Sequence, residues 1–191
     1  MFRFLNPLLR KKKVRATRVR RKGARRSDVL HEFVNELGLR SGLDRRELES
    51  MVRELELYEE DVEPHGLNGS EGAARNVVAR NGIVECALCE WPAQSEVFSI
   101  VQARGTEVLR VWSGKVVLTE HYYVNGKMKP YCVAELHEGS VVSLPPAVVY
   151  GIQNRNEERA RTLHFLSPPP TIMPDSEGVR KMCKQGRFSL V

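Results

Sequence analysis

The sequence predicts a mostly β fold, an antiparallel barrel or double-sheet sandwich preceded by two short helices and a basic N-terminal extension. The main support is a series of nine short segments rich in β-branched residues between residues 76 and 166, separated by turn residues. The 191 residues include 41% hydrophobic residues and 14 glycines, a globular composition that excludes wholesale disorder. No apolar run approaches the roughly 20 residues that a membrane-spanning helix needs, so no membrane span is expected.

Residues 1–26 form a basic arm that differs in charge from everything after it. The arm holds 12 of the 30 Lys and Arg residues and no Asp or Glu, whereas residues 27–191 carry a net charge of −6. Because Lys and Arg release counterions when they meet phosphates, such a segment favours a polyanionic partner. A mitochondrial transit peptide and a solvated tail or nuclear signal are the other interpretations of the arm. We expect contact with ribosomal RNA through Arg10, Lys11, Lys12, Lys13, Arg15, Arg18, Arg20, Arg21, Lys22, Arg25 and Arg26.

Residues 27–72 are expected to form a helical leader. Ser27 or Asp28 can cap the first helix, which ends before Gly38 and has an apolar stripe of Val29, Leu30, Phe33, Val34 and Leu37. Asp44 can cap a second helix, which is expected to end at the acidic run 59–61 and to bury Leu48, Met51, Val52, Leu55 and Leu57. The Gly- and Asn-containing residues 65–72 predict a linker.

Residues 73–191 are expected to form the β domain and an irregular C-terminal tail. The predicted strands cover residues 76–78, 83–91, 97–102, 108–112, 115–124, 132–136, 140–144, 149–153 and 161–166. Asn125 and Gly126 favour a two-residue hairpin turn, since a type I′ turn needs positive φ at both central positions. The prolines at 168–170 end the last strand.

Four segments of the β region carry a family resemblance. They are Arg75-Asn76-Val77-Val78, Cys89-Glu90-Trp91, residues 109–114 (LRVWSG) and residues 162–169 (TLHFLSPP). In these segments and in its two-helix leader, the chain resembles the cysteine dioxygenase family from residue 27 to the C-terminus. Members of that family have a cupin fold, which is a double-stranded β-helix or jelly-roll barrel, hold ferrous iron on three histidines and add oxygen to a cysteine sulfur. The resemblance therefore implies a cupin barrel.

The iron-binding histidines of that family have no counterpart in this chain. The first metal motif is His-x-His, four residues, an acid or cysteine, six residues and a glycine. Counted back from Gly114, it places Glu107 at the acidic position and Ile100 and Gln102 at the histidines. The second motif places Tyr150 at its histidine, and its other positions are occupied by Gly139, Pro145, Ala147 and Asn154. Since isoleucine has no lone pair and Gln, Glu and Tyr replace three imidazoles poorly, we expect no metal, no cofactor and no catalytic residue.

Part of the family's hydrogen-bonded triad is kept. The resemblance places Thr162 and His164 at the positions of the triad's serine and histidine. Leu166 occupies the position of the triad's tyrosine, so we expect this chain of hydrogen bonds to be broken. We interpret His164 as a hydrogen-bonded core histidine.

Arg75 stands at the position of the arginine that binds the substrate carboxylate in that family. We interpret it as structural, paired with a carboxylate such as Glu85 or Glu107. The predicted relict pocket comprises Arg75, Gln102, Glu107, Tyr150, Thr162 and His164.

Cys86 and Cys89 have CxxC spacing, which can open a zinc or redox site. Their segment is predicted to be a strand, however, in which residues three apart point to opposite faces. We therefore expect structural cysteines. The four cysteines of the chain are also too few for a disulfide scaffold and fit a reducing compartment.

These observations predict a non-catalytic cupin-fold protein of the mitochondrial matrix, a structural component of the mitochondrial ribosome. Ribosomal RNA and neighbouring ribosomal proteins are the expected partners, and no small-molecule substrate is expected. An active thiol dioxygenase or another metal-dependent cupin enzyme stays open, and it would need Gln102, Glu107 and Tyr150 as ligands. Two further hypotheses are a structural subunit of a protein-only mitochondrial complex and a small-molecule sensor that uses Arg75.

Overall fold

The computed structural model describes residues 29–40, 42–67, 72–101, 105–125, 127–144, 146 and 149–170. The basic arm, the predicted caps Ser27 and Asp28, Gln102, Pro145 and Ala147 lie outside the described residues. No helix in the described part of the chain is long and apolar enough to cross a bilayer.

The two predicted leader helices are confirmed. Helix α1 (Val29–Gly38) buries the predicted apolar stripe, and α2 (Arg45–Glu54) begins where the Asp44 carboxylate accepts the backbone N–H of Glu47 at 2.8 Å. A side-chain acceptor at this position satisfies one of the donors that a helix N-terminus leaves free. Leu55 and Leu57 lie beyond the end of α2 but still pack against the core.

The prediction that the second helix ends at the acidic run 59–61 is wrong, because α2 already ends at Glu54 and the acidic run begins a short helix of its own. Helix α3 (Glu59–Val62) starts after Tyr58, whose backbone N–H donates to the Asp61 carboxylate at 3.0 Å. Acidic residues favour the first turn of a helix, where the free N–H groups and the helix dipole are positive. A 3-10 turn, η2 (Glu63–His65), then leads toward the first strand.

All nine predicted strands are confirmed within the described residues. They are β1 (Ala74–Arg80), β2 (Glu85–Trp91), β3 (Ser95–Val101), β4 (Thr106–Ser113), β5 (Lys115–Val124), β6 (Lys127–His137), β7 (Val141–Leu144), β8 (Val149–Asn154) and β9 (Ala160–Ser167). Strands β5 and β6 form the predicted hairpin, in which Val124 pairs with Lys127 and Asn125 has a φ of 50°.

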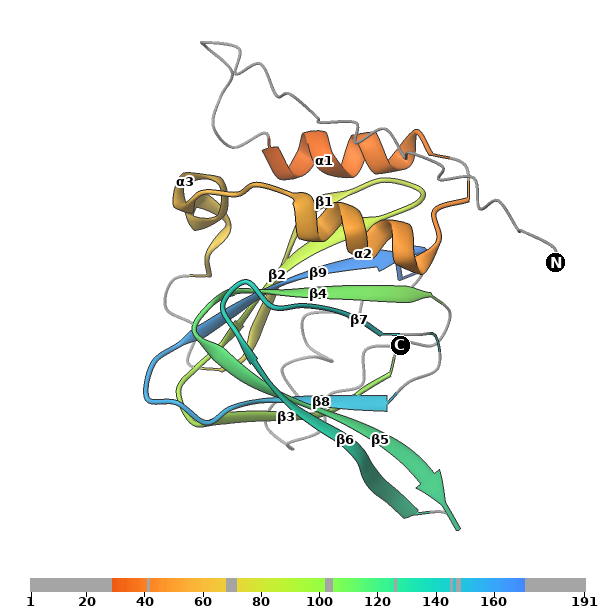
Figure 1. The fold of residues 1–191 in the computed structure, drawn as a ribbon. Coiled ribbons are helices and arrows are strands. Elements are labelled where there is room, and N and C mark those ends of the chain that lie inside the picture. The colour runs from red at the N-terminus through yellow and green to blue at the C-terminus, as the bar shows by residue number, and fades with distance from the viewer. Residues whose placement is uncertain are drawn as a thin grey trace, which may run out of the picture.

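The strands form two sheets in the order of a jelly roll. In the described residues a five-stranded sheet has the order β1-β2-β9-β4-β7 and a four-stranded sheet has the order β3-β8-β5-β6. From β2 to β9 the chain changes sheet at every connection except the β5–β6 hairpin, which is the connectivity of the double-stranded β-helix, and β1 adds an edge strand. The fold is thus a mostly β cupin-type barrel with short helices before it, as expected (Figure 1).

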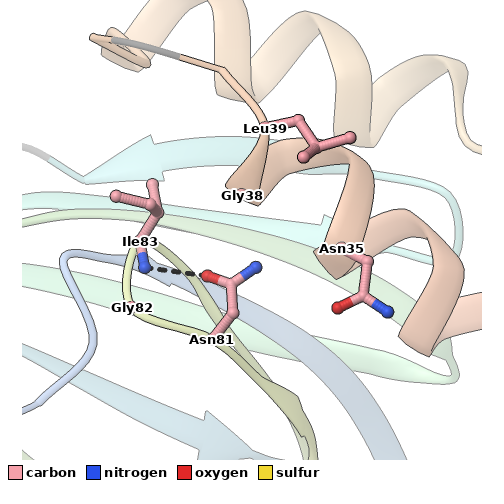
Figure 2. Close-up of a pocket in the computed structure, with 6 residues that line it drawn as sticks. All are labelled: Asn35, Gly38, Leu39, Asn81, Gly82 and Ile83. Atoms are coloured by element: carbon pink, nitrogen blue, oxygen red, sulfur yellow. Dashed lines mark hydrogen bonds between the residues drawn. The ribbon is translucent and has the colours of Figure 1, made fainter.

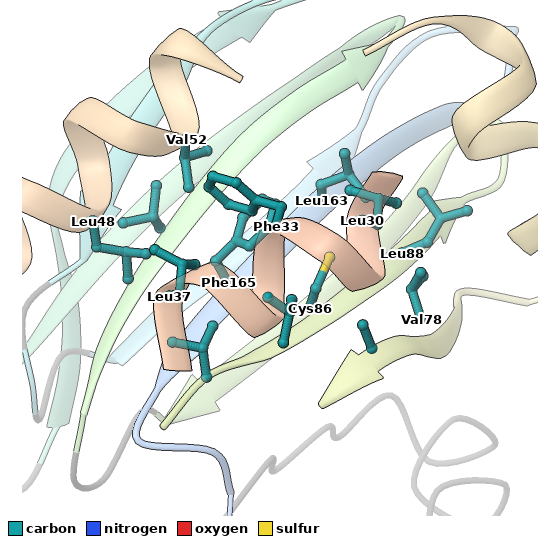
Figure 3. Close-up of a cluster of buried hydrophobic side chains, with 14 of the residues drawn as sticks. Leu30, Phe33, Leu37, Leu48, Val52, Val78, Cys86, Leu88, Leu163 and Phe165 are labelled. Carbon is teal, nitrogen blue, oxygen red and sulfur yellow. The ribbon is translucent and has the colours of Figure 1, made fainter. Parts of the chain in front are cut away.

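The helices cover the outer face of the five-stranded sheet, so the molecule has two apolar clusters (Figure 1). In the first, side chains of α1 and α2 pack on outward-facing residues of the sheet, with Phe33 edge-to-face on Phe165 at 5.6 Å between ring centroids (Figure 3). The second fills the barrel between the sheets and includes Cys89, Leu109 and Tyr150. Strand β2 is buried along all seven of its residues because it faces both clusters.

Arginines from the sheet tie the helical leader to the barrel. Arg110 on β4 donates to the backbone carbonyl of Val52 at 3.2 Å and to that of Leu55. Val52 lies in the last turn of α2, and Leu55 is its C-cap residue. Such bonds satisfy carbonyls that the helix itself leaves free. Arg161 on β9 joins Glu63 of the leader to the buried Glu90 of β2. The leader is therefore part of the same folded unit as the barrel.

Candidate functional site inside the barrel

A continuous chain of hydrogen bonds crosses the barrel interior. The Trp91 indole N–H donates to Thr162 Oγ1 at 2.8 Å, and Thr162 Oγ1 lies 2.7 Å from His164 Nε2. His164 Nδ1 bonds to one oxygen of Glu107, and the Tyr150 hydroxyl donates to the other at 2.6 Å. The five residues come from β2, β9, β4 and β8, so the chain links both sheets.

Alternation along β9 puts its polar residues in this interior. Leu163 and Phe165 face the helices, whereas Thr162 and His164 point the other way, into the barrel. This series of hydrogen bonds is shielded from water, since Tyr150 and Thr162 are 0% exposed and Glu107 and His164 are only 2% and 3% exposed. Buried polar groups of this kind are stable only when their hydrogen-bonding capacity is used within the protein.

The network holds a buried ion pair. Burial alone lowers the pKa of His164, but Cys89 and Glu107 outweigh burial and raise this pKa to about 10. His164 is therefore an imidazolium at neutral pH, and it donates one N–H to Glu107 and the other to Thr162. Burial and the neighbouring Glu107 raise the pKa of Tyr150, so its hydroxyl stays protonated and acts as a donor.

Arg75 on β1 forms the predicted structural pair. Its guanidinium bonds to the fully buried carboxylate of Glu85, the first residue of β2, and Arg80 approaches the same carboxylate at 3.2 Å. Two arginines thus neutralise one buried glutamate at the β1–β2 end of the sheet. In the β1–β2 register Arg75 lies directly opposite Cys89.

The structure brings most of the predicted relict pocket together, with Gln102 outside the described residues. Ile100 and Tyr150, both at positions of family histidines, are direct partners across β3 and β8, and Tyr150 bonds to Glu107. The predicted bond between Thr162 and His164 is confirmed.

Leu166, at the position of the triad's tyrosine, has no polar side-chain atom, so the family's triad ends at His164 as expected. The hydrogen-bonded chain instead continues from His164 in another direction. Glu107 and Tyr150 extend it, although the family motifs place both of them only at positions of the metal site. The bond between Glu107 and Tyr150 joins residues 43 positions apart. The signal that the sequence offers for it is a Glu and a Tyr on different strands that both face the barrel interior.

The CxxC cysteines lie on opposite faces of β2, as alternation predicts. Cys86 belongs to the cluster under the helices and Cys89 to the cluster inside the barrel. Both are free thiols, as is the exposed Cys132 on β6. Among the described residues, no three His, Cys, Asp or Glu side chains are grouped so that they could hold a metal ion.

A surface hollow lies away from the barrel interior, between the end of α1 and the β1–β2 turn (Figure 2). The Asn81 side chain shapes this turn, since its oxygen accepts the N–H groups of Ile83 and Val84 at 2.8 and 2.9 Å and its amide donates to the Val34 carbonyl. The lining is Asn35, Gly38, Leu39, Asn81, Gly82 and Ile83. It contains no ionisable side chain, so the hollow provides no acid, base or nucleophile.

Of the comparisons with known proteins, the search of solved structures found similar chains. No protein-family model matches the chain. No curated protein matches it. Similar solved structures include a double-stranded β-helix protein from Klebsiella pneumoniae, with 21% identity, a TM-score of 0.45 and coverage of 56% of this chain and 86% of that one.

Two further solved structures are also similar to this chain. A protein from Thermus thermophilus has 18% identity and a TM-score of 0.49, over 58% of this chain and 96% of that one. A cupin superfamily protein from Desulfitobacterium hafniense has 13% identity and a TM-score of 0.42, over 55% and 84% of the two chains.

Proposed function

We propose that this chain is a non-catalytic cupin-fold protein, related to the cysteine dioxygenase family, that serves as a structural component of a ribonucleoprotein, the mitochondrial ribosome. The observation that carries the proposal is the division of charge along the chain. Residues 1–26 hold 12 cations and no anion, while residues 27–191 have a net charge of −6. A basic arm on an acidic folded domain suits a protein that is anchored to RNA by its arm.

The residues inside the barrel support a non-catalytic role, because they do not fit the three-histidine iron site of the family. Isoleucine at position 100 has no donor atom, and Tyr150 is a protonated donor to Glu107. Glu107 is in turn occupied by His164, so these polar groups satisfy one another. The ring of Tyr150 is fully buried and packs in the apolar cluster inside the barrel.

The arm supports RNA as the partner. Its cations occur in two dense groups, residues 10–13 and 18–26, which is typical of segments that track a phosphate backbone. Each phosphate that a cation neutralises in single-stranded RNA adds about −0.7 to the slope of log K against log salt. Binding through the arm is therefore expected to weaken steeply as salt rises.

The mitochondrial setting rests on the composition of the same segment. It is rich in arginine, contains apolar residues such as Phe2, Phe4 and Leu5, and lacks acidic residues, as mitochondrial targeting segments do. One segment can serve first as an import signal and then as an RNA anchor. The matrix is then the compartment in which the protein acts.

The test is gradient sedimentation of the full-length protein from gently lysed mitochondria, with and without RNase. We expect migration with ribosomal particles, release by RNase, and loss of association when residues 1–26 are deleted. The matched pair is Arg20→Gln/Arg21→Gln in the arm and Arg45→Gln/Arg46→Gln on the exposed start of α2. Both variants remove two cations, but only the first is expected to weaken association.

Three outcomes contradict the proposal. Migration as a free species of 21.7 kDa overturns the assembly role. Migration with a large particle that RNase leaves unchanged points to a protein-only complex. Stoichiometric iron in the purified protein, together with thiol-dependent oxygen uptake, overturns the non-catalytic assignment.

A further inference from the structure

The β5–β6 hairpin extends beyond the barrel as a two-stranded ribbon (Figure 1). Strand β5 pairs with β8 only from Val117 to His121, whereas its pairing with β6 continues to the turn at Asn125. Past His121, within the part of the chain that the structure describes, each of the two strands therefore has only the other as its neighbour in the sheet. This projecting part of the hairpin, residues 122–131, is the ribbon.

A β-bulge on β6 lies at the base of the ribbon. Glu120 on β5 pairs with Cys132. The next pair joins His121 to Pro130, so Tyr131 is an extra residue inserted between two cross-strand pairs. A bulge of this kind bends its strand and redirects a side chain. The Tyr131 side chain is 76% exposed, so its ring is presented to the surroundings where the ribbon leaves the barrel.

The hairpin also differs in charge from the rest of the folded domain. Residues 121–134 contain two lysines, Lys127 and Lys129, and no Asp or Glu, although residues 27–191 as a whole have a net charge of −6. They also contain three of the five tyrosines of the chain. Lys129 and Tyr131 are both exposed. Proteins bind single-stranded nucleic acid through this combination, in which cations contact phosphates and an aromatic ring stacks on a base.

We propose that the ribbon binds single-stranded RNA, with the Tyr131 ring stacked on a base and the Lys129 ammonium group at a neighbouring phosphate. Every base has a π-face, so the contact is expected to tolerate different sequences. This contact rests on the proposed function in having RNA as its partner. It lies on the folded domain, however, and is separate from the contact that the basic arm makes.

The edge of β6 favours RNA over a strand of another protein as the occupant. Strand addition needs a continuous row of backbone N–H and C=O groups along the edge. Pro130 has no N–H, and the bulge at Tyr131 interrupts the row. Lysines on an edge strand also disfavour pairing with another strand. Stacking and phosphate contacts need no such row, so they are compatible with this sequence.

The test is protection of Cys132 from alkylation in the full-length protein. Cys132 is exposed and directly follows Tyr131, whereas Cys86 and Cys89 are buried and serve as internal references. Iodoacetamide is applied with and without a saturating oligouridylate of about 12 nucleotides, and peptide mass spectrometry gives the rate for each cysteine. We expect the RNA to slow alkylation of Cys132 at least about five-fold. Heparin, a polyanion without bases, is expected to bind the arm and to protect Cys132 less.

Matched variants separate the role of the ring from that of the charge. Tyr131→Ala is expected to weaken binding of the oligouridylate about ten-fold, whereas Tyr131→Phe, which keeps the ring, is expected to retain it. Lys129→Gln is expected to reduce the slope of log K against log salt by about 0.7. Lys115→Gln removes an exposed cation at the other end of β5 and is expected to leave the protection of Cys132 unchanged.

Three results overturn the contact at the ribbon. In the first, the RNA binds and Arg20→Gln/Arg21→Gln weakens this binding, but the alkylation rate of Cys132 does not change. The arm is then the RNA anchor, the proposed function stands, and the ribbon is left to a protein partner. In the second, Tyr131→Ala protects Cys132 as well as the wild type does, which excludes stacking. In the third, the protein does not bind RNA at all, which overturns the proposed function as well.

Discussion

Replacing Tyr150 with phenylalanine removes one oxygen atom from the barrel interior and leaves the ring in place. The lost hydroxyl donates to Glu107 at 2.6 Å, and Tyr150 is fully buried. A hydrogen bond to a charged group contributes about 1.5–3 kcal/mol to stability. Water cannot replace the donor without entering the packed barrel, so we expect the free energy of unfolding to fall by about 2 kcal/mol.

Urea unfolding followed by circular dichroism measures this loss directly. For a chain of this size, about 2 kcal/mol corresponds to a fall in Tm of about 4–8 °C. The control is Tyr131→Phe on β6, where the side chain is 76% exposed and the change is expected to stay within about 0.5 kcal/mol. Equal and small effects of the two substitutions would refute the interpretation that the Tyr150 hydroxyl anchors the buried ion pair.

Three further predictions concern the leader and the buried histidine. Phe33→Ala removes the ring that packs on Phe165 and is expected to cost about 3–5 kcal/mol in urea unfolding of the whole domain, whereas a loss below about 1 kcal/mol would show that the leader is not part of the core. Arg110→Met keeps the aliphatic contacts but removes the donors to the end of α2, so we expect a loss of about 1–2 kcal/mol and fraying of that helix in hydrogen exchange; unchanged protection would contradict this role. Because the folded-state pKa of His164 is about 10 and its ordinary value is 6.5, its stabilising contribution is complete below pH 6.5 and is lost as the pH rises toward 10. Unfolding free energies from pH 6.5 to 10 should therefore fall more in the wild type than in His164→Gln, and parallel curves would exclude a charged folded-state imidazole.

The elements of the fold could be predicted because local pattern determines them. Helical spacing of apolar residues indicates α1 and α2, and alternation on β9 indicates that Thr162 and His164 share a face. The Arg75–Glu85 pair is also within reach of the sequence, because β1 and β2 are consecutive antiparallel strands joined by a short turn.

The rest depends on pairings between distant strands. The bond between Glu107 and Tyr150 exists only because β4 and β8 face each other from different sheets of the barrel, and no local periodicity reports that arrangement. Helix α3 escapes prediction for another reason. Its four residues are too few to show apolar residues at helical spacing, and its start depends on the bond from the Tyr58 N–H to the Asp61 carboxylate.

Strand β2 contributes side chains to both apolar clusters, and this affects how the molecule unfolds. One face of the strand carries Cys86 and Leu88 under the helices, and the other carries Cys89 and Trp91 inside the barrel. Withdrawing the helices would expose one face of this strand to water, and opening the barrel would expose the other. Since neither cluster can stay packed without strand β2, the helical layer and the barrel are expected to unfold together in one cooperative transition.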